Sequence, residues 1–264
     1  MLKAELHTHI NLDPQDHRFI TYNAYDLIDA AVEQGFQILA ITCHDFWYED
    51  PQAKKYAAER GLLLLSGIER TIEGKHTLLY NISSSLAMSI HSFDDLHRAR
   101  QDHPDMLVIA AHPFHFGPTC LKKTILTNAD LFDAWEYSFF HVSFFDPNQK
   151  TVTLAKKYGK PIVGNSDVHK LKDLGRTYTL IDVSAVEVSA QAPNDDLADV
   201  SVDAPIKVDA QIDDPLNEQK IFQAIRQGKV QVVTKPLPLL EAAHITGKAL
   251  FHMARKKMTR FLGG

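Results

Sequence analysis

The sequence has 264 residues, 45% of them hydrophobic, with 12 Gly and 12 Pro. It can therefore bury one substantial core, which excludes a disordered chain and a disulfide-stapled mini-protein. Two cysteines, Cys43 and Cys120, are too few for a disulfide framework or a thiolate metal site. Lys and Arg total 28 against 33 for Asp and Glu, a net charge of −5, which argues against stable binding of duplex nucleic acid or of an anionic membrane.

The first residues contain no apolar signal core behind a basic start, and no apolar stretch approaches the roughly 20 residues that a bilayer helix needs. We therefore expect a cytoplasmic protein without membrane contact. Histidine is abundant, with 14 residues, and it is the commonest metal ligand in proteins.

Short runs rich in Val, Ile and Leu alternate with amphipathic stretches along the chain. These runs predict strands at 3–8, 36–42, 62–68, 77–82, 106–111, 131–137, 161–165 and 178–183. Helices closed by a glycine are predicted at 24–34, 50–60 and 148–158. The repeated order indicates an α/β protein with a parallel sheet and right-handed crossovers. Seven or eight such strands favour a distorted (β/α)7-8 TIM-like barrel over an open doubly wound sheet.

The segment 184–216 breaks this pattern, because it is rich in Asp and Ala, lacks aromatic residues and has little periodicity. We predict a mobile acidic insertion that provides no metal ligand and that proteases cut first. A helix at 217–228, a strand at 230–234 and a basic helical stretch at 238–262 are predicted to form the C-terminal helical tail, 217–264. We expect residues 1–264 to form a single domain.

Potential metal ligands stand at the ends of the predicted strands. They are His7 and His9 in the first strand, His44 and Asp45 after the second, Glu69 after the third, His112 after the fifth, Glu136 in the sixth, and Asp167 and His169 after the seventh. The carboxyl ends of barrel strands form the active-site face, so these side chains are expected to converge. Imidazole and carboxylate ligands without thiolate suit Zn, Mn or Fe. The set is too large for one ion, and bridging carboxylates such as Glu69 and Asp167 imply two or three divalent ions.

Five motifs occur in a characteristic order. They are His7-Thr8-His9, Ile41-Thr42-Cys43-His44-Asp45, Gly67-Ile68-Glu69 followed by His76, Ala111-His112-Pro113-Phe114, and Asn165-Ser166-Asp167-Val168-His169 with Leu174-Gly175. In this order they resemble the polymerase and histidinol phosphatase (PHP) family, over about residues 4–183 and again over 217–240. The resemblance implies a distorted β/α barrel with a trinuclear metal centre that hydrolyses phosphoesters.

The resemblance also implies a ligand set for each ion. The first ion would be held by His7, His9, Glu69 and Asp167, and the second by Glu69, His76 and His112. His44 and His169 would serve a third ion, completed by a ligand from the loop after His9. Asp13, Asp16 and His17 in that loop can each reach it, and we favour His17 over Asp16. Cys43 stands where the family commonly has Asp, and we interpret it as a buried free thiol.

Other residues are candidates for roles around the metals. Asp45 and His169 are candidate catalytic residues that stabilise the departing alkoxide, and Glu136 is expected to support the ligands. His115, Lys170 and Arg176 are candidate substrate-binding residues, which suggests a compact pocket for phosphate charge.

The sequence thus predicts a metal-dependent phosphoesterase of small phosphorylated substrates. It contains no long basic or aromatic groove for a polynucleotide strand, so small phosphomonoesters are expected to react faster than oligonucleotides. The alternatives are a metal-dependent nuclease or amidohydrolase, and a non-catalytic metal-bound binding module. Neither the substrate, nor the native metal, nor the oligomeric state follows from the sequence.

Overall fold

The computed structural model describes residues 1–184, 186 and 216–243. The predicted acidic insertion lies almost wholly outside the described residues, so its mobility stays a prediction. Residues 239–243 begin the predicted basic helix, and the rest of that helix lies outside the described residues.

Nine strands form one sheet in the order β7-β6-β5-β4-β3-β2-β1-β8-β9. Their bounds are Leu2–Glu5 (β1), Ile38–Ile41 (β2), Leu63–Ile72 (β3), Lys75–Tyr80 (β4), Leu107–Ala110 (β5), Ala134–Ser138 (β6), Ile162–Asn165 (β7), Thr177–Ile181 (β8) and Val230–Thr234 (β9). Each predicted strand is present, and the barrel class is confirmed.

The prediction of a wholly parallel sheet is wrong, because β4 runs antiparallel to β3 and β5, and β8 runs antiparallel to β1 and β9. Between β3 and β4 the chain turns over Glu73 and Gly74, whose φ angles are 48° and 74°. A two-residue turn with positive φ at both positions matches the twist of a tight hairpin and sends the next strand back. His76, at the start of β4, therefore pairs with Thr71 near the end of β3.

The two edges of the sheet approach each other and nearly close the barrel. The hydroxyl of Thr179 in β8 accepts a hydrogen bond from the Gly164 N–H in β7 and donates one to the Gly164 carbonyl, both at 2.9 Å. A Cβ on Gly164 would lie 2.6 Å from the Val232 side chain of β9. Glycine is therefore required for this close approach.

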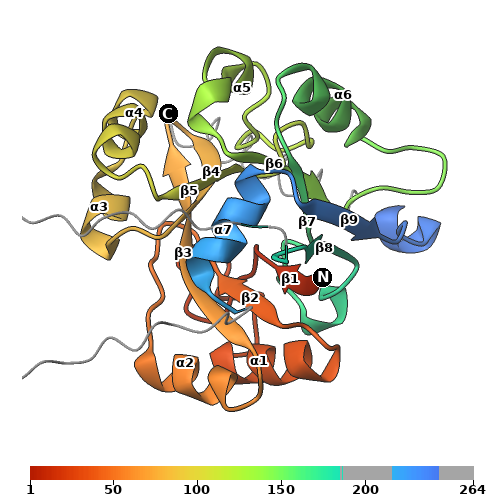
Figure 1. The fold of residues 1–264 in the computed structure, drawn as a ribbon. Coiled ribbons are helices and arrows are strands. Elements are labelled where there is room, and N and C mark those ends of the chain that lie inside the picture. The colour runs from red at the N-terminus through yellow and green to blue at the C-terminus, as the bar shows by residue number, and fades with distance from the viewer. Residues whose placement is uncertain (185, 187–215, 244–264) are drawn as a thin grey trace, which may run out of the picture.

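Helices surround the sheet (Figure 1). Their bounds are Ala24–Glu33 (α1), Pro51–Ala58 (α2), Ser84–Ser89 (α3), Phe93–Asp102 (α4), Thr124–Thr127 (α5), Gln149–Lys157 (α6) and Glu218–Arg226 (α7), with 3-10 turns at Ala129–Leu131 and Leu171–Asp173. Helix α7 lies across one end of the barrel in this view, and its buried Phe222 and Ile225 join the core formed by Leu2, Ile38 and Tyr80. The potential metal ligands that follow β1, β2 and β7 therefore lie at the opposite end of the barrel.

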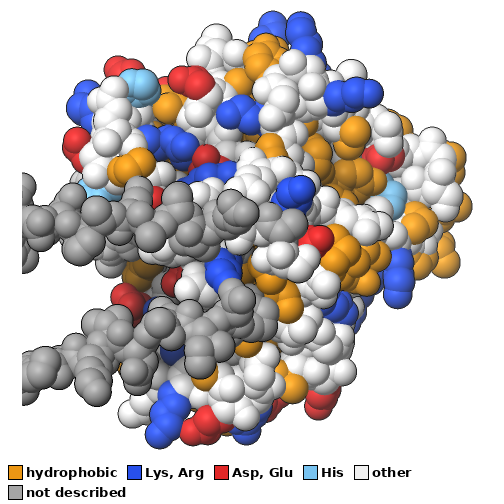
Figure 2. All heavy atoms as spheres, in the orientation of Figure 1, with side chains coloured by type: hydrophobic (Ala, Val, Ile, Leu, Met, Phe, Trp, Pro, Cys, Tyr) orange, Lys and Arg blue, Asp and Glu red, His pale blue; other side chains and the backbone are white. Residues whose placement is uncertain are grey.

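The α7 face is shown in Figure 2, where Lys and Arg side chains lie among Asp and Glu side chains in its visible described part. Within the described residues, no helix combines the length and the apolar character that a membrane span requires.

Candidate metal centre

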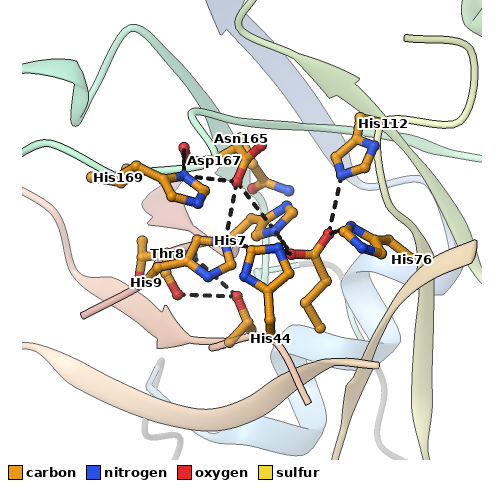
Figure 3. A network of polar contacts seen from close by, with 12 residues as sticks. His7, Thr8, His9, His44, His76, His112, Asn165, Asp167 and His169 are labelled. Carbon is orange, nitrogen blue, oxygen red and sulfur yellow. Dashed lines mark hydrogen bonds and ion pairs between the residues drawn. The ribbon is translucent and has the colours of Figure 1, made fainter. Parts of the chain in front are cut away.

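The first potential ligands, His7 and His9, come from the continuation of β1. Glu5, His7 and His9 follow one another at intervals of two residues, so their side chains project to the same side of an extended chain. All three are buried, and the His7 and His9 rings lie 5.2 Å apart. Figure 3 shows His7, His9, His44, Asp167 and His169 directed toward one another.

Glu69 lies at the middle of the cluster and divides it in two. The structure places it inside β3, which continues to Ile72, and not at the strand end as predicted. Its Oε1 lies 2.7 Å from Nδ1 of His76 and 3.0 Å from Nε2 of His112. Its Oε2 lies 3.2 Å from Nε2 of His7 and 3.0 Å from Nε2 of His44. A carboxylate placed in this way is suited to bridge two cations.

A second carboxylate, Asp167, contacts the other side of the same histidines. Its Oδ1 lies 3.2 Å from Nε2 of His9 and 3.4 Å from Nε2 of His7. One ligand atom from each of His7, His9, Glu69 and Asp167 lies within 4.8 Å of the others, and the same holds for His9, His44 and His169 and for His44, Glu69 and His76.

Two of these strand ends have an unusual backbone. Asp167 has a φ of 50° and His112 a φ of 28°, in the left-handed region that non-glycine residues rarely adopt. Such a backbone conformation costs free energy and persists only where surrounding contacts hold the residue in place. Residues of this kind cluster at functional sites.

Carboxylates behind the cluster orient the histidine rings. Glu136 lies 2.9 Å from Nδ1 of His7 and accepts hydrogen bonds from Asn165 at 2.8 Å and from the His112 N–H at 2.6 Å. Because Glu136 holds Nδ1 of His7, the Nε2 atom faces the cluster. Glu136 thus has the supporting position expected from the sequence.

Asp13 has the same relation to two other rings. Its Oδ2 lies 2.8 Å from Nδ1 of His9 and 2.9 Å from Nδ1 of His44, so both rings turn Nε2 toward Glu69 and Asp167. Its Oδ1 accepts the N–H groups of Gln15 and Asp16. Asp13 therefore fixes the loop and the two rings together.

The geometry does not support the preference for His17. The His17 side chain is exposed and makes no hydrogen bond or ion pair with a described residue. Oδ2 of Asp16 lies 3.1 Å from Nε2 of His169 and 3.9 Å from Nδ1 of His44, and Asp16 groups with Asp13 and His44 as a set of possible ligands. The short turn after Asp13 carries His17 outward and Asp16 inward.

The carboxylates of the cluster shift the pKa values of two of its histidines upward. Burial lowers the pKa of His44, but Glu69 and Asp13 raise it to about 11. Burial also opposes a charged His7, yet Glu136, Glu69 and Asp167 hold its pKa well above the ordinary value. Burial alone would raise the pKa of Glu69, whereas the surrounding histidines hold it well below its usual range. The site therefore favours added positive charge, whether protons or metal ions.

Buried polar atoms without a hydrogen-bond partner indicate what kind of cation the site can hold. Nε2 of His7, both ring nitrogens of His76 and Oε2 of Glu69 are buried and form no hydrogen bond of normal geometry within the described chain. Nε2 of His7 nonetheless lies 3.2 Å from Oε2 of Glu69, and Nδ1 of His76 lies 2.7 Å from Oε1 of Glu69. Since buried polar atoms without partners are costly, a shared divalent cation suits this arrangement. The donor set of imidazole and carboxylate suits Zn, Mn or Fe.

Comparison with known proteins gives a match to one family model. Residues 145–192 match the PHP_C family model, described as PHP-associated. The predicted resemblance to the PHP family is confirmed. No curated protein matches the chain.

Solved structures show a similar fold. PsfC from Pseudomonas syringae PB-5123 is 16% identical, with a TM-score of 0.52 over 70% of this chain and 83% of PsfC. A Bifidobacterium adolescentis protein assigned as a metal-dependent phosphoesterase is 18% identical, with a TM-score of 0.47 over 63% of this chain and 87% of its own. An amidohydrolase from Chromobacterium violaceum is 15% identical, with a TM-score of 0.48 over 65% and 89%. At these identities the likeness to PsfC shows a common fold.

Asp45 is not directed into the cluster, although the sequence made it a catalytic candidate. Its Oδ1 accepts hydrogen bonds from the Thr71 N–H and from the guanidinium of Arg70. Arg70 alternates with Glu69 along β3 and so projects to the opposite face of the strand. Despite burial, these partners lower the pKa of Asp45. Its position is that of an anchor for the segment after His44.

The three candidate substrate-binding residues have different surroundings. Arg176 is held by ion pairs to Asp173 at 2.8 Å and to Glu241 at 2.7 Å, so its charge is already compensated. Lys170 is exposed, and its side chain makes no hydrogen bond or ion pair with the described chain. His115 is half-buried between Phe116 and Phe140, and burial together with His112 lowers its pKa to about 4. His115 is linked to the cluster through His112, whose carbonyl accepts the His115 N–H at 3.1 Å.

Glu5 is a buried residue that the sequence reasoning missed. Its two carboxylate oxygens accept the Ser166 N–H at 3.0 and 3.1 Å, which ties β1 to the end of β7. Burial raises its pKa to about 8. The period-two spacing from His7 and His9 was the signal that placed it on the same face.

Proposed function

We propose that this chain is a metal-dependent phosphoesterase that hydrolyses small phosphomonoesters at a centre of two or three divalent ions. The observation that carries the proposal is the division of the two buried Glu69 oxygens between separate groups of histidines. By this proposal the ligands are His7, His9, His44, Glu69, His76, His112, Asp167 and His169, with Asp16 in place of His17.

The residues of the chain prepare the site before any substrate arrives. Glu136 and Asp13 hold the Nδ1 atoms of His7, His9 and His44, which leaves each Nε2 free to bind. Ions bound there supply Lewis-acid polarisation of a phosphoryl group and a water acidic enough to attack near neutral pH. Preorganised ligands of this kind avoid reorganisation during the reaction.

One side of the cluster is open to a substrate. The side chains of His7, His9 and Glu69 are at most 1% exposed, whereas those of Asp16, Asp167 and His169 are 32%, 23% and 29% exposed. A phosphate group would approach over these three residues. His169 is therefore the candidate to stand beside the departing alkoxide, and Asp45 is not.

The test combines metal analysis with an activity panel. The purified protein is depleted by a chelator, reloaded with Mn, Zn or Fe, and assayed with glycerol phosphate, AMP, oligonucleotides and amides under matched conditions. We expect activity to return with metal, and phosphomonoesters to have the highest kcat/KM. Glu69→Gln should lose metal and at least about 1,000-fold in kcat, since several kcal/mol of charge stabilisation disappear.

The control is His97→Ala, which removes an exposed histidine of α4 and should alter neither metal content nor rate. Far-ultraviolet circular dichroism checks that both variants fold. Metal-free protein that no ion activates would overturn the proposal in favour of a binding module. A higher kcat/KM for oligonucleotides or amides would favour the nuclease or the amidohydrolase instead.

A further inference from the structure

The histidines of the candidate metal centre differ in the groups that lie behind their rings. Nδ1 of His7 lies 2.9 Å from the Glu136 carboxylate. Asp13 contacts Nδ1 of His9 at 2.8 Å and Nδ1 of His44 at 2.9 Å. A carboxylate in this place fixes the ring and makes its other nitrogen a better electron donor to a metal ion.

Two other histidines, His76 and His112, are backed differently. Both rings face Oε1 of Glu69, with Nδ1 of His76 at 2.7 Å and Nε2 of His112 at 3.0 Å, and Figure 3 shows them on one side of the cluster. The other ring nitrogen of His76, Nε2, is buried without a hydrogen-bond partner in the described chain. The other ring nitrogen of His112, Nδ1, lies 3.5 Å from Sγ of Cys120. On the side away from Glu69, these two rings therefore have no carboxylate partner within the described residues.

Cys120 returns to His112 because the loop after β5 folds back on itself. The two residues are eight positions apart in the sequence. The Lys122 N–H donates a hydrogen bond to the Pro113 carbonyl at 2.8 Å, which closes the loop. The Cys120 side chain is only 1% exposed. Its thiol is therefore held against the imidazole and cannot turn toward solvent.

The same stretch of loop also fixes His76. The His76 N–H donates a hydrogen bond at 2.9 Å to the carbonyl of Thr119, the residue before Cys120. One short segment thus contacts both histidines that face Oε1 of Glu69, through its main chain in one case and through a side chain in the other.

A thiol affects an imidazole less strongly than a carboxylate does. With an ion bound at Nε2 of His112, Nδ1 carries the ring proton and donates it to Sγ of Cys120. Sulfur is a weak hydrogen-bond acceptor. The contact therefore fixes the ring, but it adds little to the electron-donating power of Nε2.

We propose that Cys120 is a positioning residue for His112. The ion held by His76, His112 and Oε1 of Glu69 is then the most weakly bound ion of the centre. The thiol keeps Nε2 of His112 directed at the cluster, whereas the missing carboxylate support makes this ion the first to dissociate. This inference rests on the proposed metal centre, to whose ions it assigns different affinities.

The experiment measures the binding of zinc alone, without substrate. Metal-free protein is reloaded with zinc, and a chromophoric chelator competes for the metal, which gives a dissociation constant for each equivalent. We expect one equivalent to bind at least about tenfold more weakly than the others, because partners behind a metal-bound histidine change metal affinity by about 10- to 100-fold. His112→Ala should abolish that equivalent and so assign it.

Two substitutions at Cys120 distinguish positioning from packing. Cys120→Ala leaves Nδ1 of His112 without its partner and should weaken the weakest equivalent by about tenfold while the others are unchanged. Cys120→Asp supplies a carboxylate and should strengthen the same equivalent, whereas a purely structural role predicts weaker binding in both variants. Circular dichroism checks the fold, and Cys120→Ala alone decides if the aspartate variant does not fold.

Cys43→Ala is the matched control, because Cys43 is also a buried free cysteine and packs among apolar residues. It should leave the affinity of the weakest equivalent unchanged. Equal affinities for all equivalents in the wild-type protein, or a loss in Cys120→Ala that all ions share equally, would overturn the inference. Such results leave the proposed function standing, whereas a protein that binds no zinc, manganese or iron refutes the metal-dependent function itself.

Discussion

Asp13 and Asp16 are only three residues apart, yet their carboxylates have different surroundings. Asp13 is buried and contacts two imidazole rings and three backbone N–H groups, those of Gln15, Asp16 and His44. Asp16 is one-third exposed and lies against His169. A carboxylate that already accepts five hydrogen bonds orients ligands, whereas one with free lone pairs can itself bind an ion.

This difference gives a prediction at residue level. Asp16→Asn should lower the metal content by about one equivalent and kcat by at least about 100-fold, because a neutral amide binds divalent ions weakly. His17→Ala should leave both unchanged, since its side chain is exposed outside the cluster. The measurement is elemental analysis with steady-state kinetics of each variant, and the reverse result would restore His17 as the ligand.

The sequence could predict most of the cluster because the potential ligands follow strand ends, and a barrel brings strand ends together. It could not decide which of Asp13, Asp16 and His17 completes the set of ligands. The directions of these side chains depend on a loop whose turns are fixed by side-chain hydrogen bonds. It also made Asp45 a candidate, since alternation along β3 and the presence of Arg70 behind it are visible only once the strands are paired.

At the level of elements, the reversed β4 is what brings His76 to Glu69. Hydrophobic alternation predicts a strand but not its direction, so a parallel sheet was a reasonable expectation that the turn at Glu73 and Gly74 overrides. His76 therefore lies near the start of β4, at the end of the barrel where the neighbouring strands β3 and β5 end. The tight turn thus adds a potential ligand to the cluster.

Helix α4 provides a prediction on pH. Asp95 accepts the N–H groups of His91 and Ser92 at 3.0 and 2.8 Å, and hydrogen bonds with Ser92 and His91 lower its pKa to about 2. Because the folded pKa lies below the unfolded one, this contribution is present above about pH 4 and is lost as the pH falls toward 2. Asp95→Asn should therefore destabilise the protein above pH 4 and less at lower pH.

The measurement is the urea midpoint of metal-free protein between pH 3 and 6, without metal so that ligand protonation does not interfere. Asp94→Asn serves as the control, since it removes a carboxylate from the same helical turn that makes no hydrogen bond with a described residue. A pH-independent difference between wild type and Asp95→Asn would show that the capping interaction does not depend on the charge.

For the whole molecule, the sequence predicted a barrel because the number of strands and the intervening helices leave few other ways to cover both faces of a sheet. It could not predict how the barrel closes, since closure depends on Gly164 meeting the hydroxyl of Thr179 across the seam. Nor could it predict the pocket lined by Lys75, Lys122, Lys123 and Lys150, whose walls come from β4, the loop after β5 and α6. Both features arise from tertiary proximity between segments without a shared pattern.

The raised pKa of a buried histidine in the cluster leads to a last prediction, for the stability of the whole protein. Glu69 and Asp13 raise the pKa of His44 to about 11 against the opposing effect of burial, which favours the protonated ring in metal-free protein. A histidine with a raised pKa stabilises the fold below its unfolded value of roughly 6.5, and that contribution is lost as the pH rises through the folded value. Metal ions must displace these protons, so added Mn or Zn should release protons and should raise Tm more at pH 9 than at pH 6.5. At 100 times the dissociation constant the stabilisation is about 2.7 kcal/mol, or roughly 5 to 10 °C in Tm for a chain of this size. Scanning calorimetry at several pH values, with Glu69→Gln for comparison, measures the effect, and a Tm gain that shrinks with rising pH would contradict it.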